Sequence, residues 1–419
     1  MRRTLSLLAL IFAGEMIFSL PFHLPRYFRP SFLETFSLSN AALGDAFAVY
    51  GVTAMLAYFP GGLIADRLPA RALMSGSLMA TAAGGLYLYS LPDANGLGWL
   101  YGYWGVTTIL LFWAAMLRAT RSWGGDASQG KAFGILDGGR GLAAAACASI
   151  AVALFSASLS GEAGGIPTER DGAMQVVIIF YICATALAAI GVWCFLEQPT
   201  VPGHSDKRQA TLQDVTPINA VLRQPAVWMQ AAIVVCAYCG YKGLDNIALY
   251  AHVVLSLSET DAAQLTAAGA YARPIAAVCA GLLADRLDAA KVIAVTFALM
   301  LLSSIGLAVA EPANVFMLYI YASIALSFFS VFALRGVYFA LTHQIRVPFG
   351  ATGTAVGLVS VIGYTPDIFF APVAGRILDA APGLAGHQTY YWMLSGIALG
   401  GAVLTITLLR YLRAKENTL

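Results

Sequence analysis

Ionisable side chains interrupt several long apolar stretches of this sequence. The basic and acidic members of this set are Arg140, Lys242, Arg273, Glu15, Asp45, Asp137, Asp245 and Asp367. A charge in the middle of a membrane segment costs about 2.5–3.5 kcal/mol on insertion scales, so such residues usually serve a function. Guanidinium groups pair with both oxygens of a carboxylate, sulfonate or phosphate, and buried carboxyl groups can exchange protons. The set therefore predicts anion binding and proton transfer.

Proton transfer needs a carboxyl group that changes its protonation state. Burial favours the neutral acid, whereas a nearby cation favours the carboxylate. Glu15 has no basic residue within four positions of it in its own segment, so it is the first candidate, and Asp367 is the second. Asp137 and Asp245 each lie three residues from a basic residue and are expected to stay ionised. The alternative role for Glu15 is a structural hydrogen bond to a neighbouring helix.

The spacing leaves open whether the buried charges neutralise one another. Asp137 with Arg140, and Lys242 with Asp245, are each three residues apart and could pair on one helix face. Arg273 has no obvious acid on its own segment, so we expect it to face an anionic ligand. Two tyrosines next to buried charges, and two residues suggested by the repeat described next, complete the predicted substrate-binding set: Arg140, Lys242, Arg273, His23, Arg26, Tyr241 and Tyr364.

An internal repeat organises the elements that carry these residues. Residues 37–68 align without a gap on residues 256–287, at an offset of 219, and 11 of the 32 positions are identical. The same offset places His23 on Lys242 and Arg26 on Asp245. Internal symmetry of this kind is typical of transporters, with the binding site between the copies. Both repeat partners are therefore expected to line a central cavity.

The composition indicates that lipid is the main solvent of the chain. Hydrophobic residues make up 59% and charged residues 11% of 419 residues, against about 25% charged in soluble proteins. We predict an all-α membrane protein with twelve spans near 4–28, 42–65, 71–92, 97–118, 131–158, 173–195, 226–252, 262–284, 291–309, 313–335, 350–373 and 389–412. Two six-helix halves, 1–196 and 225–419, would be joined by a cytoplasmic linker at 197–224.

Basic residues predict the orientation of these spans. With both termini in the cytoplasm, 17 of the 24 Lys and Arg residues fall at cytoplasmic ends, as the positive-inside rule requires. Four fall at outer ends: Arg26, Arg29, Arg170 and Arg376. The sequence therefore predicts a multi-pass plasma-membrane protein of the bacterial inner-membrane type.

The turns that close the two repeat copies carry a resemblance to a known family. Residues 62–71 read Gly-Leu-Ile-Ala-Asp-Arg-Leu-Pro-Ala-Arg, and residues 281–286 read Gly-Leu-Leu-Ala-Asp-Arg. With twelve spans and a central linker, this pattern resembles the major facilitator superfamily of secondary transporters. The resemblance implies alternating access by a functional monomer. It also implies a cytoplasmic latch that holds one conformational state, made of Gly62, Asp66, Arg67, Arg71, Asp285 and Arg286.

Other function classes fit the sequence less well. There is no Lys/Arg cluster for nucleic acid, no HExxH or GxSxG motif of an enzyme, and no Cys/His set for a metal or cofactor. The Gly-Pro motif of drug exporters is missing from the fifth span, where residues 134–141 read Gly-Ile-Leu-Asp-Gly-Gly-Arg-Gly. We therefore expect a transporter of a small organic anion, coupled to protons or to exchange, with some likeness to the organophosphate branch. An exporter of amphipathic compounds is the alternative, and a non-transporting receptor a remote one.

Overall fold

The computed structural model describes residues 2–124, 129–159, 167–197, 222–312, 317–345 and 352–416. Within these ranges every regular element is a helix, as the fold prediction requires. Most of the predicted linker, at 198–221, lies outside the described residues.

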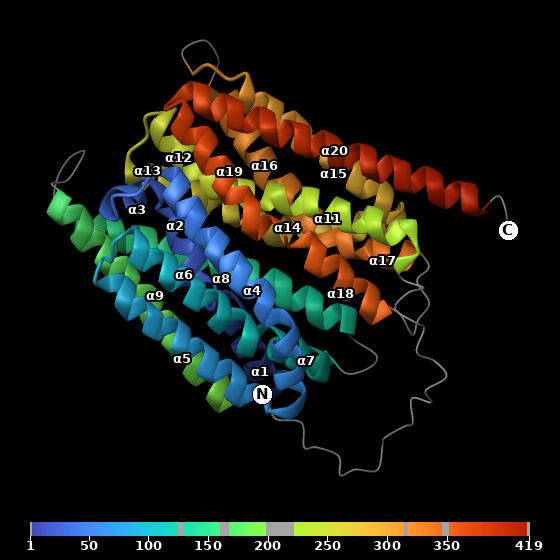
Figure 1. Cartoon of the computed structure of the whole chain (residues 1–419), viewed down its shortest axis with the longest axis horizontal. Coiled ribbons are helices and arrows are strands. Elements are labelled where there is room, and N and C mark those ends of the chain that lie inside the picture. The colour runs from blue at the N-terminus through green and yellow to red at the C-terminus, as the bar shows by residue number, and fades with distance from the viewer. Residues whose placement is uncertain are drawn as a thin grey trace. The chain divides into compact units, whose positions relative to one another are not determined.

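The first half of the sequence contains nine α-helices and two π-helical turns in the described residues (Figure 1). They are α1 (Arg2–Met16), η1 (Ser19–His23), α2 (Leu24–Tyr27), α3 (Arg29–Thr35), α4 (Asn40–Arg67), α5 (Ala70–Tyr89), α6 (Ala94–Thr108), η2 (Ile109–Trp113), α7 (Ala114–Gly124), α8 (Gln129–Ser158) and α9 (Pro167–Phe195).

The second half has more interrupted helices among its described residues. They are α11 (Pro225–Gly243), η3 (Leu244–Asn246), α12 (Ile247–Val253), α13 (Glu259–Ala270), α14 (Ala272–Arg286), α15 (Ala289–Ala308), α16 (Met317–Val337), η4 (Tyr338–Ala340), α17 (Leu341–Gln344), α18 (Thr352–Gly363), α19 (Pro366–Ala380) and α20 (Leu384–Glu416).

Nine helices of the described residues are long and apolar enough to span a membrane, or ten if the bent pair Arg2–Met16 and Ser19–Tyr27 is one span. The two other predicted spans, near 71–92 and 226–252, coincide with α5 and with α11 and α12. The break between α11 and α12 is a 3₁₀ turn at Leu244–Asn246. Helices thus lie at all twelve predicted positions.

The repeat reappears in the backbone. Ser37 and Ser256, 219 residues apart, both adopt a left-handed conformation, with φ of 49° and 55°. Two residues later, Ser39 accepts a hydrogen bond from the backbone N–H of Ala42, and Ser258 accepts one from Asp261. These side chains satisfy the free N–H groups at the starts of α4 and α13. The same local sequence therefore builds the same turn and helix start twice.

The helices form two compact units. Unit 1 comprises Met1–Gln198, Asp245–Pro274 and Asp367–His387; unit 2 comprises Pro199–Leu244, Ile275–Pro366 and Gln388–Leu419. Unit 1 thus contains the predicted first half together with two segments of the second. The division into halves at 197–224 remains a prediction about the repeat.

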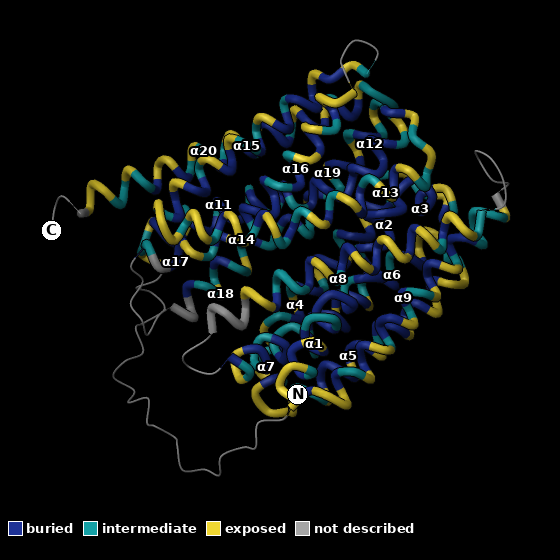
Figure 2. Tube along the Cα trace, turned by 180° about the vertical axis from the view of Figure 1, so that it is seen from behind, coloured by how far each residue is buried: buried dark blue, intermediate teal, exposed yellow. Residues whose placement is uncertain are grey.

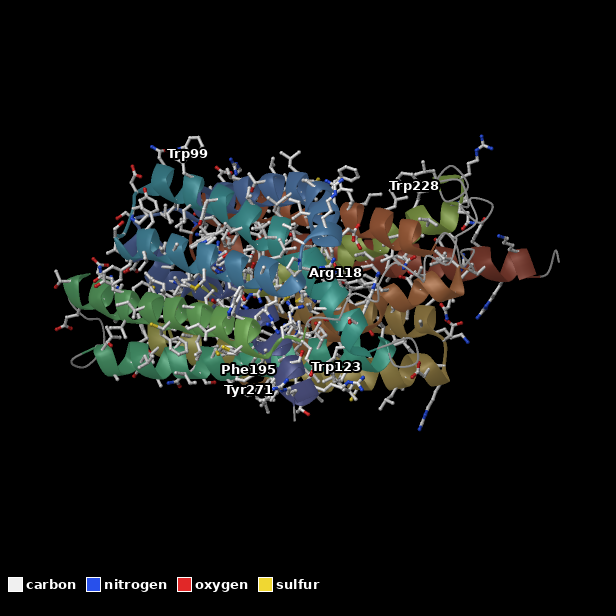
Figure 3. All side chains as sticks on the ribbon, turned by 90° about the horizontal axis from the view of Figure 1, so that it is seen from below. Trp99, Arg118, Trp123, Phe195, Trp228 and Tyr271 are labelled. Atoms are coloured by element: carbon white, nitrogen blue, oxygen red, sulfur yellow. The ribbon has the colours of Figure 1, made fainter. Side chains whose placement is uncertain are left out.

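Large apolar side chains are exposed on many helices, where Figure 2 shows exposed residues alternating with buried ones. On α4, Leu56 and Phe59 are 72% and 79% exposed, and Trp99 on α6 is 83% exposed and points away from the ribbon (Figure 3). Such residues are rare in contiguous patches on soluble proteins. Their exposure fits helices that face lipid.

Aromatic rings fill the interior of unit 1. Phe22 contacts Phe47, Phe47 contacts Tyr101, and Tyr101 contacts Trp104, with ring centroids 5.2–5.5 Å apart. Tyr101 and Trp104 are fully buried. The hydroxyl of Tyr101 donates to the carbonyl of Pro21 at 3.0 Å. This contact fixes α6 against the bent end of the first span, which carries the predicted site residues.

Candidate functional site

Glu15 lies where the first span bends. Helix α1 ends at Met16, and the chain turns by 41° into the π-helical segment Ser19–His23. Pro21 in this segment has no N–H to donate, which disfavours a regular α-helix there. The hydroxyl of Ser19 donates to the carbonyl of Met16 at 2.7 Å. The bend places Glu15, which is 3% exposed, inside unit 1.

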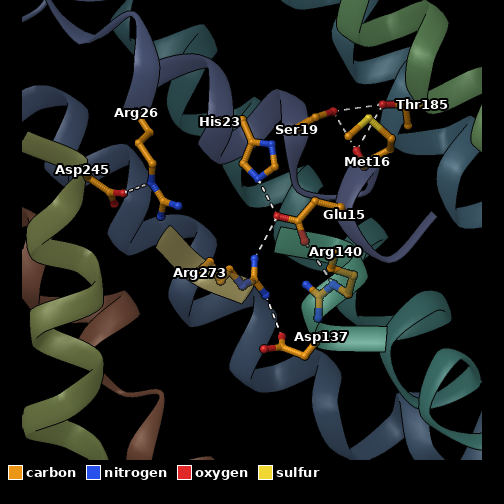
Figure 4. A network of polar contacts seen from close by, with 10 residues as sticks. All are labelled: Glu15, Met16, Ser19, His23, Arg26, Asp137, Arg140, Thr185, Asp245 and Arg273. Carbon is orange, nitrogen blue, oxygen red and sulfur yellow. Dashed lines mark hydrogen bonds and ion pairs between the residues drawn. The ribbon is translucent and has the colours of Figure 1, made fainter. Parts of the chain in front are cut away.

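Three side chains converge on the Glu15 carboxylate (Figure 4). The Nε of Arg140, from α8, donates to Oε2 at 3.1 Å, and Nη1 of Arg273, from α14, donates to Oε1 at 3.2 Å. The Nε2 of His23 lies 3.2 Å from Oε1. The Nη2 of Arg273 also donates to Asp137 at 2.7 Å. We call these five residues the Glu15 cluster.

The cluster balances its charges in a buried place. The side chains of Glu15, Arg140 and Arg273 are 4%, 10% and 6% exposed, and only Asp137 is partly open, at 40%. With His23 neutral, two carboxylates face two guanidinium groups. Removing charges from water is costly unless they are paired and hydrogen-bonded, as these are.

Glycines make room for the two arginines. A Cβ at Gly141 would lie 2.8 Å from Cδ of Arg273, and one at Gly14 would lie 3.1 Å from Cδ of Arg140. A Cβ at Gly139 would lie 2.6 Å from Ile11. The Gly-Gly-Arg-Gly run of α8 therefore lets α1 and the Arg273 side chain approach closely. The sequence contained this signal, but its connection to Arg273 required the structure.

In the sequence, only neighbours on the same helix were considered. In the structure Glu15 has cationic partners and Arg273 has acidic ones, and each partner comes from another helix. Arg140 pairs with Glu15 and Asp137 pairs with Arg273, although same-helix pairing was the expected alternative. Spacing along one helix cannot reveal these neighbours. The roles of these residues in binding and proton transfer remain predictions.

Arg26 and Asp245, which the repeat offset placed at equivalent positions, contact one another directly. The Nε of Arg26 donates to Oδ1 of Asp245 at 2.5 Å, and their side chains are 9% and 6% exposed. The sequence offered Lys242 as the cation that could neutralise Asp245. In the structure Arg26, from the first half of the sequence, binds the Asp245 carboxylate.

The other predicted substrate and proton residues lie apart from the cluster in the sequence. Lys242, in unit 2, is 3% exposed at the end of α11. In the same unit the Arg335 guanidinium lies 3.8 Å from the ring centroid of Tyr241, and Tyr364 contacts Tyr238 at 4.9 Å. Asp367 lies in the first turn of α19, in unit 1. Its backbone carbonyl oxygen packs against Gly51 of α4, where a Cβ would lie only 2.6 Å from it. Nothing in the local sequence of Arg335 marked it as a partner of the Tyr241 ring.

Five of the six predicted latch residues lie near the ends of α4 and α14, and Arg71 lies at the start of α5. Asp66, Arg67, Asp285 and Arg286 are exposed, and nothing lies within 4 Å of a Cβ built on Gly62. Arg71 binds inside the first half, where its Nε donates to the carbonyl of Leu196 at 2.9 Å. The latch role of this set remains a prediction about another conformational state.

The family model of the Major Facilitator Superfamily matches residues 5–366. The chain belongs to this superfamily. It is 27% identical to the inner membrane protein YihN of Escherichia coli K12, over 97% of this chain and 96% of that protein. This superfamily member is therefore a multi-pass membrane transporter, not an enzyme.

Solved structures share the fold of this transporter. A bacterial homologue of the human lysosomal transporter Spinster, in an inward-facing and occupied conformation, matches with a TM-score of 0.74, 15% identity and coverage of 97% and 96% of the two chains. The nucleoside transporter NupG matches with a TM-score of 0.75, 12% identity and coverage of 97% and 99%. At these identities the likeness establishes the fold alone.

Proposed function

We propose that this transporter carries a small organic anion whose charged group binds Arg140 and Arg273. One observation carries the proposal: two buried guanidinium groups converge on a single carboxylate. A substrate carboxylate, sulfonate or phosphate offers the same arrangement of oxygen acceptors as Glu15. Glu15 then competes with the substrate for the two arginines.

Protonation of Glu15 would decide this competition. A neutral carboxyl group binds guanidinium more weakly than a carboxylate does, because the charge-assisted contact is lost. One proton on Glu15 therefore releases both arginines, and one negative charge on the substrate restores the balance of the cluster. His23, 3.2 Å from the same carboxyl oxygen, is placed to share that proton. This coupling supports either proton-driven uptake or exchange of one anion for another.

We propose that both termini lie in the cytoplasm of an inner-membrane-type bilayer and that the monomer is functional. The distribution of basic residues supports the orientation, and the inner-membrane naming of YihN supports the location. Lys242, Tyr241 and Tyr364 remain predicted substrate contacts, with Asp367 as a second predicted proton carrier.

A ligand panel tests the anion proposal. The purified protein in detergent is heated with small anionic, cationic, zwitterionic and neutral solutes, and its unfolding is followed. A ligand at about 100 times its Kd stabilises a protein by about 2.7 kcal/mol if it binds only the folded state. We expect one anion class to stabilise the wild type but neither Arg140→Gln nor Arg273→Gln.

Arg121→Gln is the matched control, because Arg121 is exposed on α7; it should keep the full ligand response. Stabilisation by lipophilic cations or neutral compounds alone, unchanged in the two cluster variants, would overturn the proposal in favour of the exporter function.

A further inference from the structure

The four basic residues that the orientation places at outer ends all take part in bonds. Outer cations are exceptions to the positive-inside rule, so their presence calls for a physical reason. In the structure Arg26 binds Asp245, Arg29 binds Asn40, Arg170 binds Glu34 and Glu259, and Arg376 binds Asp45. Three of the four reach an acid in the other half of the sequence.

The Arg26–Asp245 pair has a special position because its members are repeat equivalents. A two-fold axis that exchanges the repeat copies passes midway between equivalent residues. Two equivalent residues in contact at 2.5 Å therefore both lie beside that axis. Arg26 is three residues beyond His23, about one helical turn from the Glu15 cluster. The pair thus lies on the outer side of the cluster.

Around this pair, the start of α4 is bound to α19. The carboxylate of Asp379 accepts hydrogen bonds from the backbone N–H groups of Asn40 and Ala41, at 3.1 and 2.7 Å. An acid at a helix start satisfies free N–H groups and complements the helix dipole. A Cβ at Gly44 would lie 2.4 Å from the carbonyl oxygen of Ala371, so α4 and α19 pack backbone to backbone.

The repeat-equivalent helix start, that of α13, is bound in the same way to the first half. Glu259, the equivalent of Asn40, receives a hydrogen bond from Arg170 at 2.9 Å and a short one from the hydroxyl of Ser31. Arg170 also contacts Glu34 at 2.6 Å. Figure 1 shows α3, α12 and α13 together at this end of unit 1. Both helix starts therefore carry a polar clasp to the other half.

We infer that these contacts form a gate that closes the predicted outer side of the transporter in this conformation. Arg26–Asp245 is its centre on the repeat axis, and the clasps at the starts of α4 and α13 are its rim. The outer cations are present because each bonds across or beside this closure. Opening the outer side requires the Arg26–Asp245 pair to separate. The inference does not depend on the charge of the substrate.

Spin-label distances test the gate. Nitroxides are attached to Asn95→Cys at the start of α6 and Pro382→Cys after α19, both exposed, in a background that lacks the six native cysteines. We expect the starting protein to give one short-distance population. Arg26→Gln should add a longer-distance population, because the buried Asp245 carboxylate loses its charge-assisted bond to Arg26 and the open, hydrated state becomes more favourable.

Two controls keep the result decisive. A second label pair within the first half, Asn95→Cys with Thr168→Cys, should keep its distance in every variant and so reports correct folding. Exchanging the charges, Arg26→Asp with Asp245→Arg, should restore the short population. The inference is overturned if Arg26→Gln leaves the cross-half distances unchanged in a folded protein, or if the exchanged pair stays as open as the single variant.

Discussion

The Glu15 cluster and the Asp45–Arg376 pair use the same chemical groups in opposite surroundings. Arg376 holds Asp45 through two hydrogen bonds, at 2.8 and 3.2 Å, while Glu15 shares its oxygens among partners at 3.1–3.2 Å. By geometry alone the Asp45–Arg376 pair is the better one. Yet its side chains are 53% and 59% exposed, against 4–10% for Glu15 and its two arginines.

Solvent exposure reverses the energetic order of these two regions. Water replaces the bonds of an exposed pair at little cost, whereas a buried charge that loses its partner has nothing to replace it. The exposed pair can therefore open and close with a moving rim. The buried cluster changes only when a proton or another charged group compensates, as expected of a site that couples binding to transport.

The largest effect is expected from Glu15→Gln. The variant leaves two buried guanidinium groups facing one carboxylate, and breaking a buried pair costs about 3–5 kcal/mol. It also removes the carboxyl group that we assign to proton coupling. In proteoliposomes, with the anion found by the ligand panel, accumulation driven by a pH gradient should be lost. Exchange between internal and external anion should remain.

Glu197→Gln makes the same chemical change at an exposed position and should leave stability and accumulation unchanged. If pH-driven accumulation persists in Glu15→Gln, the coupling role belongs to another residue, with Asp367 next to be tested.

Local features of this fold could be predicted from the sequence alone. The repeat predicted equivalent serine turns, and the apolar runs predicted helices at all twelve positions. These features are local, so neighbouring residues determine them. The partners of Glu15 are not local, because Arg140 and Arg273 lie 125 and 258 residues away. Apolar periodicity indicates that a helix has a buried face, but it does not indicate which other helix covers that face.

One distant contact was nevertheless indicated by the sequence. The offset of 219 paired Arg26 with Asp245, and their charges are opposite. Equivalent residues of opposite charge near a two-fold axis attract each other, so a direct contact was derivable. It was not predicted because Lys242, three residues from Asp245, offered a simpler local partner. Pro21 marked a break in the helix at Ser19–His23, but the sequence did not show that the bend turns His23 toward Glu15.

A smaller effect is expected from Gly141→Ala, which leaves all cluster charges in place. The new methyl group would lie 2.8 Å from Cδ and 2.9 Å from Cγ of Arg273, so this side chain must shift. Overpacking of this kind costs about 1–3 kcal/mol. We expect weaker binding of the stabilising anion and a lower melting temperature.

Gly138→Ala is a close control, because nothing lies within 4 Å of a Cβ at that position of the same helix. It gains the same helix propensity without touching Arg273, so the difference between the two variants isolates the arginine. Equal anion affinities for both variants would show that the position of Arg273 is unimportant for binding.

The smallest effect is expected from Asp45→Asn, which removes the exposed partner of Arg376. Because water solvates both side chains already, thermal unfolding should match that of Asp66→Asn, an exposed change on the same helix. The label pair at 95 and 382 should show only a minor open population, well below that of Arg26→Gln.

Raising the salt from about 0.1 to 1 M shortens the Debye length from about 10 to 3 Å. High salt should therefore reproduce the effect of Asp45→Asn in the unmodified gate and leave Arg26–Asp245 closed. If Asp45→Asn opens the gate as far as Arg26→Gln does, exposure does not set the strength of these pairs, and the rim rather than the axis holds the outer side closed.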